Sequence, residues 1–278
     1  MTEPWRLSSH QCEQAIFTLW PELATAPPRW VEDGWDFRVA IVDNRWVVRV
    51  ARNHAAALRL AREVHLLHQL VDSPVPLPRY RRVALGMAVY PFITGTAVSA
   101  VHPPTLALRR ELGAFIEWLH ARSQPQQSGD VRRRWAYRRR ALYRQVKMRA
   151  LDLFSVKEAR RIKGRFEPAL TLLAESDWCP ALLHGDLTAE NILQDGGQLV
   201  GILEFGDWRW GDEAFDWSAV PGMEMVLPDR LAGNAEARAR MQFYRFTAPF
   251  YGILRGLKLG QVEVVEHGVR RVRRLLSE

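Results

Sequence analysis

Three side chains that carry oxygen atoms follow one another in a short stretch of the sequence, in the order Asp186, Asn191 and Glu204. A carboxylate can orient a hydroxyl group and accept its proton, and carboxylate and amide oxygens are ligands that Mg²⁺ accepts. Phosphoryl transfer needs these functions, because one group must orient the attacking hydroxyl while two oxygen ligands hold magnesium against the phosphates. These residue types supply the groups that phosphoryl transfer to a hydroxyl group needs.

A predicted β-hairpin positions these residues. The apolar run 199–203 directly precedes Glu204 and indicates a strand, and Asp195-Gly196-Gly197 is typical of a tight turn. Chain reversal at this turn would bring the three side chains into one cleft.

The rest of the chain divides into two regions of different pattern. β-branched and aromatic residues predict strands at 30–42, 45–50 and 82–90, with a turn at Asp43-Asn44. Apolar spacing predicts helices at 9–20, 55–70, 106–122, 133–153, 155–175 and from 237 to the C-terminus. We therefore expect an α+β protein with two lobes, a small β-rich lobe at 1–91 and a larger helical lobe at 92–278.

Composition narrows the functional classes. The 278 residues are 47% hydrophobic and carry a formal charge of +8, which excludes disorder as the main state. The basic excess lies at 132–165, with fourteen basic residues against two acidic ones, and could bind nucleic acid. We favour a solvated helix face, and do not expect a nucleic-acid partner. Two cysteines and no long apolar run predict a cytoplasmic protein that does not span a membrane.

Several motifs occur in the order found in one known family. Residues 183–193 match the kinase catalytic-loop pattern His-x-Asp-Leu-x-x-x-Asn, and Glu204-Phe205-Gly206 stands where kinases have a metal-binding Asp-Phe-Gly. With Gly211-Asp212-x-Ala214-x-Asp216, the sequence resembles the aminoglycoside phosphotransferase and choline kinase-like family. Residues 112–120 resemble the first large-lobe helix of that family and residues 87–95 its hinge, so the likeness extends over nearly the whole chain.

The resemblance implies a bilobal protein-kinase-like fold and an enzyme that moves the γ-phosphoryl group of ATP or GTP to a hydroxyl of a small molecule. It implies that Asp186 is the catalytic base or orients the hydroxyl, and that Asn191 and Glu204 bind Mg²⁺. Glu63 would pair with the cation of a strand. The residues that the resemblance assigns to nucleotide binding are Arg49, Glu63, Tyr90, Phe92 and Ile93.

Two of these residues depart from the family pattern. Arg49 stands where a lysine is expected, and its planar guanidinium is not interchangeable with an ammonium group. Glu204 stands where an aspartate is expected, and a misplacement of about 1 Å can cost roughly a hundredfold in rate. A degenerate, pseudokinase-like protein that binds a nucleotide or ligand with little or no transfer is therefore an alternative.

The acceptor is less well defined by the sequence. Acidic residues at 204–216 suit a cationic acceptor such as an amino sugar, and the resemblance implies acceptors such as aminoglycoside antibiotics, choline-like amines or sugars. The sequence leaves the acceptor and the oligomeric state open.

Overall fold

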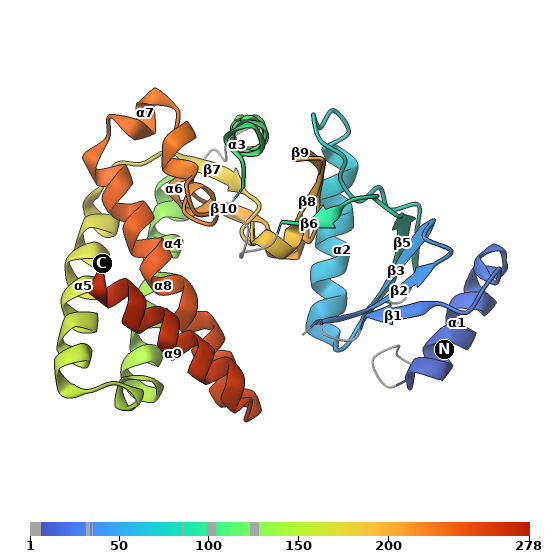
Figure 1. Cartoon of the computed structure of the whole chain (residues 1–278), viewed down its shortest axis with the longest axis horizontal. Coiled ribbons are helices and arrows are strands. Elements are labelled where there is room, and N and C mark those ends of the chain that lie inside the picture. The colour runs from blue at the N-terminus through green and yellow to red at the C-terminus, as the bar shows by residue number, and fades with distance from the viewer. Residues whose placement is uncertain (1–6, 32–33, 35, 85, 99–103, 123–127) are drawn as a thin grey trace. The chain divides into compact units, whose positions relative to one another are not determined.

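The computed structural model of the protein describes residues 7–31, 34, 36–84, 86–98, 104–122 and 128–278, and Figure 1 shows the elements that they form. The chain divides into two compact units. Unit 1 comprises Met1–Glu111 and Thr188–Trp208, and unit 2 comprises Leu112–Leu187 and Arg209–Glu278. Each unit therefore combines two stretches that are far apart in the sequence.

An antiparallel sheet with the strand order β1-β2-β3-β5-β4 forms the centre of unit 1. Its strands are β1 (Arg29–Val31), β2 (Phe37–Val42), β3 (Trp46–Ala51), β4 (Arg82–Ala84) and β5 (Met87–Pro91). The predicted turn between β2 and β3 is present, and Asp43 and Asn44 both have positive φ angles, of 52° and 51°. A pair of positive φ angles gives the turn a twist that matches that of the flanking strands.

Two predictions of single strands were wrong. Residues 30–42 form parts of two strands, β1 and β2, which pair antiparallel; of the residues between them, 32–33 and 35 lie outside the described part. Residues 82–90 likewise form the hairpin β4–β5. Gly86 adopts a φ of 79° there, a backbone conformation that residues with a side chain rarely adopt. This glycine therefore permits the chain to turn within a run of residues that otherwise favour one strand.

Helices α1 (Ser9–Leu19) and α2 (His54–Gln69) lie on opposite sides of this sheet (Figure 1). Val48 and Val50 of β3 pack into a buried cluster with Cys12 and Ile16 of α1. Successive side chains of a strand point to opposite faces. Arg49, between the two valines, therefore points to the face that α2 covers.

A second, smaller sheet in unit 1 has the order β6-β8-β9, from β6 (Thr96–Ala97), β8 (Ile192–Asp195) and β9 (Gln198–Ile202). Short 3₁₀ helices at Ala189–Asn191 and Phe205–Asp207 flank its β8–β9 hairpin. Helix α3 (Leu106–His120) follows β6 in the chain, and the division between the units falls within it.

Unit 2 is mainly helical, with a two-stranded antiparallel ribbon of β7 (Pro180–Leu183) and β10 (Arg209–Asp212). Its helices beyond α3 are α4 (Ser128–Arg149), α5 (Val156–Glu175), α6 (Ala214–Trp217), α7 (Asp229–Ala232), α8 (Ala235–Leu259) and α9 (Val262–Ser277), with short 3₁₀ helices at Leu151–Leu153 and Met223–Val226. The C-terminal region, predicted as one helix, is two, because Gly260 ends α8 with a φ of 69°. Left-handed glycines commonly end helices in this way.

Aromatic side chains fill the core of unit 2. Phe166 of α5 contacts Phe243, Phe246 and Phe250 of α8 at ring-centroid distances of 5.6 to 5.8 Å. Trp135 of α4 packs directly over the ribbon at Gly211, where an added Cβ would lie 2.3 Å from the indole ring. A glycine is therefore needed at position 211, because any side chain there would overlap the Trp135 ring.

The architecture confirms the predicted α+β class, with a sheet-based unit and a helical one. The helices predicted at 9–20, 55–70, 106–122 and 155–175 are all present within a few residues of the expected limits. Within the described residues, no helix combines the length and the apolar composition needed to cross a bilayer.

Candidate active site

The most deeply buried charges of unit 1 form an ion pair between β3 and α2. Arg49 Nη1 lies 2.7 Å from Glu63 Oε1 and 2.6 Å from Oε2, and the two residues are 1% and 0% exposed. The pairing that the sequence implied for Glu63 is therefore present, with Arg49 as its cation. Two charges removed from water must compensate each other, and this geometry does so.

Two aromatic residues complete the environment of Arg49. The Tyr80 hydroxyl accepts from Arg49 Nη1 at 2.9 Å and donates to Glu63 Oε1 at 3.1 Å. The Arg49 guanidinium also lies 3.9 Å from the centre of the Phe37 ring. The contacts of these two residues with Arg49 were not predicted: Phe37 falls within a predicted strand, and Tyr80 follows a proline-rich segment that carries no periodic signal.

The third member of this cluster is Glu204, directly after the β8–β9 hairpin. Its Oε2 atom accepts from Arg49 Nη2 at 2.6 Å. Burial by itself would lower the pKa of Arg49, but the carboxylates of Glu204 and Glu63 outweigh this effect and hold that pKa well above its usual value. The backbone of Glu204 is left-handed, with φ 64° and ψ 58°, a conformation that costs a residue with a Cβ atom about 1–2 kcal/mol. Such strain is typical of functional positions.

The predicted hairpin brings Asn191 close to Glu204 in the fold. The N–H of Leu203 donates to the carbonyl of Asn191 at 2.8 Å, and Ile192 pairs with Ile202. Gly196 and Gly197 form the predicted turn, with φ angles of 56° and 84°. Asn191, which is 8% exposed, and Glu204 thus flank the same end of one hairpin.

Asp186 lies in unit 2, at the end of a loop whose backbone is fixed by Asp216. The Asp216 carboxylate accepts from the N–H of His184 at 2.8 Å and from that of Gly185 at 3.0 Å. It also contacts His120 Nε2 at 3.1 Å. His184 Nδ1 in turn accepts from the N–H of Asp186 at 3.2 Å. The histidines therefore support the loop.

The buried Asp216 carboxylate is kept ionised by these contacts. Burial would raise the pKa of Asp216, but the hydrogen bond and charge of His120, with help from His184 and the Gly185 amide, bring that pKa below its ordinary value. A charged carboxylate can accept several hydrogen bonds at once, which suits it to hold a loop in one conformation.

The other carboxylate of this motif, Asp212, is also structural. It is fully buried and accepts from Arg240 Nε at 2.6 Å and from the Tyr244 hydroxyl at 2.7 Å. Tyr244 accepts from the indole N–H of Trp135 at 2.8 Å. Asp212 therefore ties the ribbon to helices α4 and α8.

The segment implied to bind the nucleotide base leaves β5 at Pro91. Tyr90 is buried and its ring packs edge-on against Tyr80, with the centroids 5.2 Å apart. Burial raises the pKa of Tyr90 beyond its usual range. The N–H of Phe92 donates to the carbonyl of Arg45 at 2.8 Å, so that amide is engaged within the protein.

The structure thus assembles Arg49, Glu63 and Glu204 by direct contact in unit 1 and brings Asn191 to them through the hairpin, whereas Asp186 belongs to unit 2. Carboxylate and amide oxygens at the end of one hairpin are donors of the type that Mg²⁺ prefers. No group of three or more His, Cys, Asp or Glu side chains that could hold a metal ion occurs within the described ranges. Two protein ligands nevertheless fit Mg²⁺, which keeps several waters and takes substrate phosphates as ligands.

Solved structures define the class of this fold. The GDP and kanamycin complex of APH(2")-IIia superposes with a TM-score of 0.81 at 19% identity, over 97% of this chain and 99% of that one. The macrolide 2'-phosphotransferase MphH from Brachybacterium faecium matches with a TM-score of 0.65 at 20% identity, over 94% of this chain and 98% of that one. The protein has the kinase-like fold of the antibiotic phosphotransferases, as predicted.

Sequence comparison then gives the family. The model of the phosphotransferase enzyme family matches residues 29–247, so the chain belongs to that family, and the prediction of an enzyme of the phosphotransferase class is confirmed. A shorter likeness, 30% identical over 82 residues, links it to the receptor protein-tyrosine kinase CEPR2 of Arabidopsis thaliana. That match covers 30% of this chain and only 8% of the length of the kinase.

Proposed function

We propose that the protein transfers the γ-phosphoryl group of ATP or GTP to a hydroxyl group of a small molecule. Its family supports the reaction class, and the complex of a structural neighbour with GDP and kanamycin supports a nucleotide with a small acceptor. The observation that carries the proposal is the Arg49 guanidinium, which Glu63 holds beside Glu204. It supplies a fixed positive charge next to the carboxylate that we assign to the metal.

In this mechanism, Asp186 orients the acceptor hydroxyl and takes its proton. The hydroxyl oxygen forms a bond to the γ-phosphorus while the bond from that phosphorus to the bridging oxygen breaks, and the nucleoside diphosphate leaves. The protein contributes position and charge and forms no covalent intermediate. The contacts of Asp216 with the loop amides fix the backbone from which Asp186 projects.

Asn191 and Glu204 are the residues that would hold Mg²⁺, which would neutralise charge on the phosphate oxygens. We assign the base edge to the backbone of residues 90–93. Within it, the Ile93 amide is the donor we propose, because the Phe92 amide already bonds to Arg45.

A transfer assay with Asp186→Asn tests this function. Wild type is screened with ATP and GTP against hydroxylated compounds that include aminoglycosides and macrolides. We expect Asp186→Asn to lower kcat by roughly 10²–10⁴-fold, the usual contribution of a general base. Asp195→Asn, at an exposed position in the hairpin turn, is the matched control and should leave kcat unchanged. Nucleotide binding by wild type without phosphorylation of any acceptor would overturn the proposal.

One contact favours a second candidate, a nucleotide- or ligand-binding protein without transfer. The Oε2 atom of the proposed metal ligand Glu204 is bound to Arg49, which competes with a cation for that carboxylate. The double variant Glu204→Asp with Arg49→Lys restores the family residues. A gain in turnover would show that the native site has decayed, whereas a loss would show that its residues are tuned for activity.

The acidic segment 204–216 gives less support to a cationic acceptor than the sequence suggested. Four of its carboxylates, those of Glu204, Asp212, Glu213 and Asp216, pair with Arg49, Arg240, Arg230 and His120 respectively. Aminoglycoside-type amino sugars remain the first acceptors to test, because of the structural neighbours. We place the protein in the cytoplasm, where nucleotides are available and its two cysteines stay reduced.

A further inference from the structure

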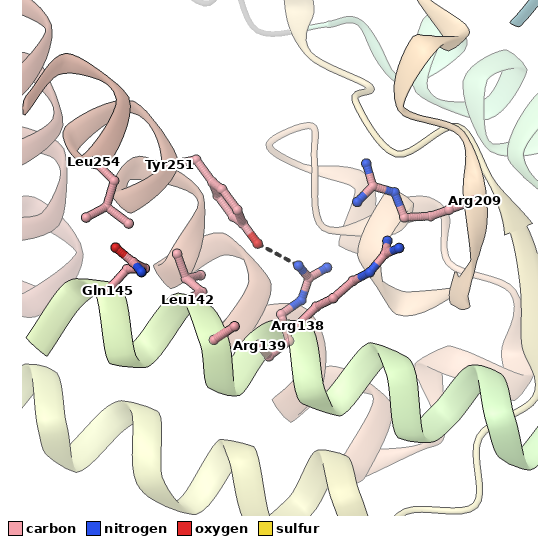
Figure 2. A pocket seen from close by; sticks show the side chains of 8 residues that line it. Arg138, Arg139, Leu142, Gln145, Arg209, Tyr251 and Leu254 are labelled. Atoms are coloured by element: carbon pink, nitrogen blue, oxygen red, sulfur yellow. Dashed lines mark hydrogen bonds between the residues drawn. The ribbon is translucent and has the colours of Figure 1, made fainter. Parts of the chain in front are cut away.

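A pocket of about 380 Å³ lies wholly within unit 2 and is lined by three arginines. Figure 2 shows the guanidinium groups of Arg138, Arg139 and Arg209 gathered around it. Leu142, Tyr251 and Leu254 give it an apolar side, and none of the described lining residues is acidic. The volume is within the range of about 300–1,000 Å³ that is usual for small-molecule sites.

Arg139 carries most of the argument, because its charge is buried without a carboxylate. The residue is only 3% exposed, and within the described part of the chain it forms no ion pair. Its Nη1 atom donates to the Tyr251 hydroxyl at 2.5 Å, while Nε and Nη2 are buried without a hydrogen-bond partner among the described residues. A buried guanidinium with unsatisfied N–H groups is costly, so we expect an ordered water, an ion or a ligand to supply the missing acceptors.

Aromatic rings hold the Arg139 guanidinium in place. Its central carbon lies 4.1 Å from the ring centre of Trp135, 4.8 Å from that of Phe215 and 5.3 Å from that of Tyr244. These contacts stabilise the cation. They cannot replace the hydrogen bonds that its N–H groups lack.

The pocket is also close to the catalytic loop along the ribbon of unit 2. Arg209 pairs in register with Leu183, three residues before Asp186. Three residues of extended chain span at most about 11 Å, a distance that a small molecule can bridge.

We propose that this pocket binds a carboxylate or phosphate group of the acceptor, so that the substrate is a hydroxylated organic anion. The inference rests on the proposed function for the identity of the ligand as acceptor. Arginine suits both anionic groups, because its planar N–H donors match their paired oxygens. Among the described residues, Arg139 has no ion pair and the pocket has no acidic lining residue. These two features distinguish the pocket from a site for an amino sugar.

Binding measured without turnover tests the site itself. Inorganic phosphate and gluconate are titrated into the nucleotide-free full chain by calorimetry, with wild type, Arg138→Gln and Arg209→Gln. We expect either substitution to weaken binding about tenfold or more, as loss of a charged hydrogen bond would. Arg140→Gln, on the exposed side of the same helix, is the control and should bind as wild type does. Equal binding by all four proteins, or none by wild type, would overturn the proposal.

Turnover with matched pairs of acceptors tests whether the bound anionic group belongs to the acceptor. It also distinguishes a carboxylate from a phosphate group. Gluconate is compared with sorbitol, and glucose 6-phosphate with glucose. We expect the anionic member of one pair to have a kcat/KM at least tenfold higher, and Arg138→Gln to raise its KM with little change in kcat. Transfer only to uncharged or cationic acceptors would overturn the inference and leave the proposed function standing. Lack of transfer to every acceptor, with anion binding intact, would overturn the proposed function and the identity of the ligand as acceptor, and would leave the anion site itself standing.

Nucleic acid is the remaining anion to distinguish. An oligonucleotide duplex is titrated at low salt against Arg138→Gln and Arg140→Gln. Equal weakening by both substitutions would mark the exposed helix face as the binding surface and would overturn the inference, whereas no binding supports a small ligand.

Discussion

Arg49 Nη2 lies 2.6 Å from Glu204 Oε2, so a cation of strand β3 contacts a carboxylate that lies two residues beyond the end of strand β9. The same guanidinium uses Nη1 for Glu63. One arginine therefore joins two acidic side chains that are 141 positions apart in the sequence, 63 and 204. A planar fork can contact both at once, whereas an ammonium group is a compact point charge.

Arg49→Lys should lower the free energy of unfolding by about 2–4 kcal/mol, because one buried carboxylate loses a close partner. Urea denaturation measures the change. Arg45→Lys, at an exposed turn position, is the control and should stay within about 0.5 kcal/mol of wild type. Equal stability of Arg49→Lys and wild type would mean that the forked geometry contributes nothing.

Glu63→Gln should destabilise the protein by about 3–5 kcal/mol, since it removes the buried partner of a buried cation. Glu204→Gln should cost less, because the Glu204 side chain is 38% exposed and water can replace its contact with Arg49. Thermal and urea unfolding of the two variants give this order directly. If Glu204→Gln destabilised the protein more than Glu63→Gln, Glu204 would be the main partner of the buried Arg49 charge.

Stability should fall in acid through Asp216. Its folded pKa is lowered relative to the unfolded value of about 3.9, so the folded state favours the charged form. This contribution is fully present above the unfolded pKa and is lost as the pH falls through the folded pKa. Unfolding of wild type and Asp216→Asn between pH 7 and pH 2 should therefore show a weaker dependence below about pH 4 in the variant. Parallel curves would exclude Asp216 as a source of acid sensitivity.

Gly211→Ala should destabilise the protein by about 1–3 kcal/mol, because the new methyl group would overlap the Trp135 ring. Gly164→Ala, within α5, is a matched control. Nothing lies within 4 Å of a Cβ at that position, so it should raise stability by about 0.5–1 kcal/mol through helix propensity. Opposite signs for the same substitution would separate packing from backbone effects, and a stabilising Gly211→Ala would contradict the close contact.

The sequence predicted the hairpin at Gly196-Gly197, most helices and the partner of Glu63, because local patterns and an ordered set of motifs carry those features. It did not predict the ribbon of β7 and β10, whose four-residue strands are too short to show a period. The contacts of Tyr80 and Phe37 with Arg49 were not predicted for a related reason. Their contacts with Arg49 depend on how strands and helix pack, and no local pattern records such packing. The roles of Asp186, Asn191 and the hinge residues stay predictions.

The hydrogen bonds from the N–H groups of His184 and Gly185 to Asp216 mean that the sequence of residues 183–193 does not by itself determine the shape of that loop. An aspartate some thirty positions downstream supplies the acceptors for its backbone. Residues 183–193 would consequently not keep this conformation if they were transferred alone to another scaffold. The scaffold would also need a carboxylate at the position of Asp216. A search that recognises relatives by the loop alone would also accept chains that lack the means to hold it.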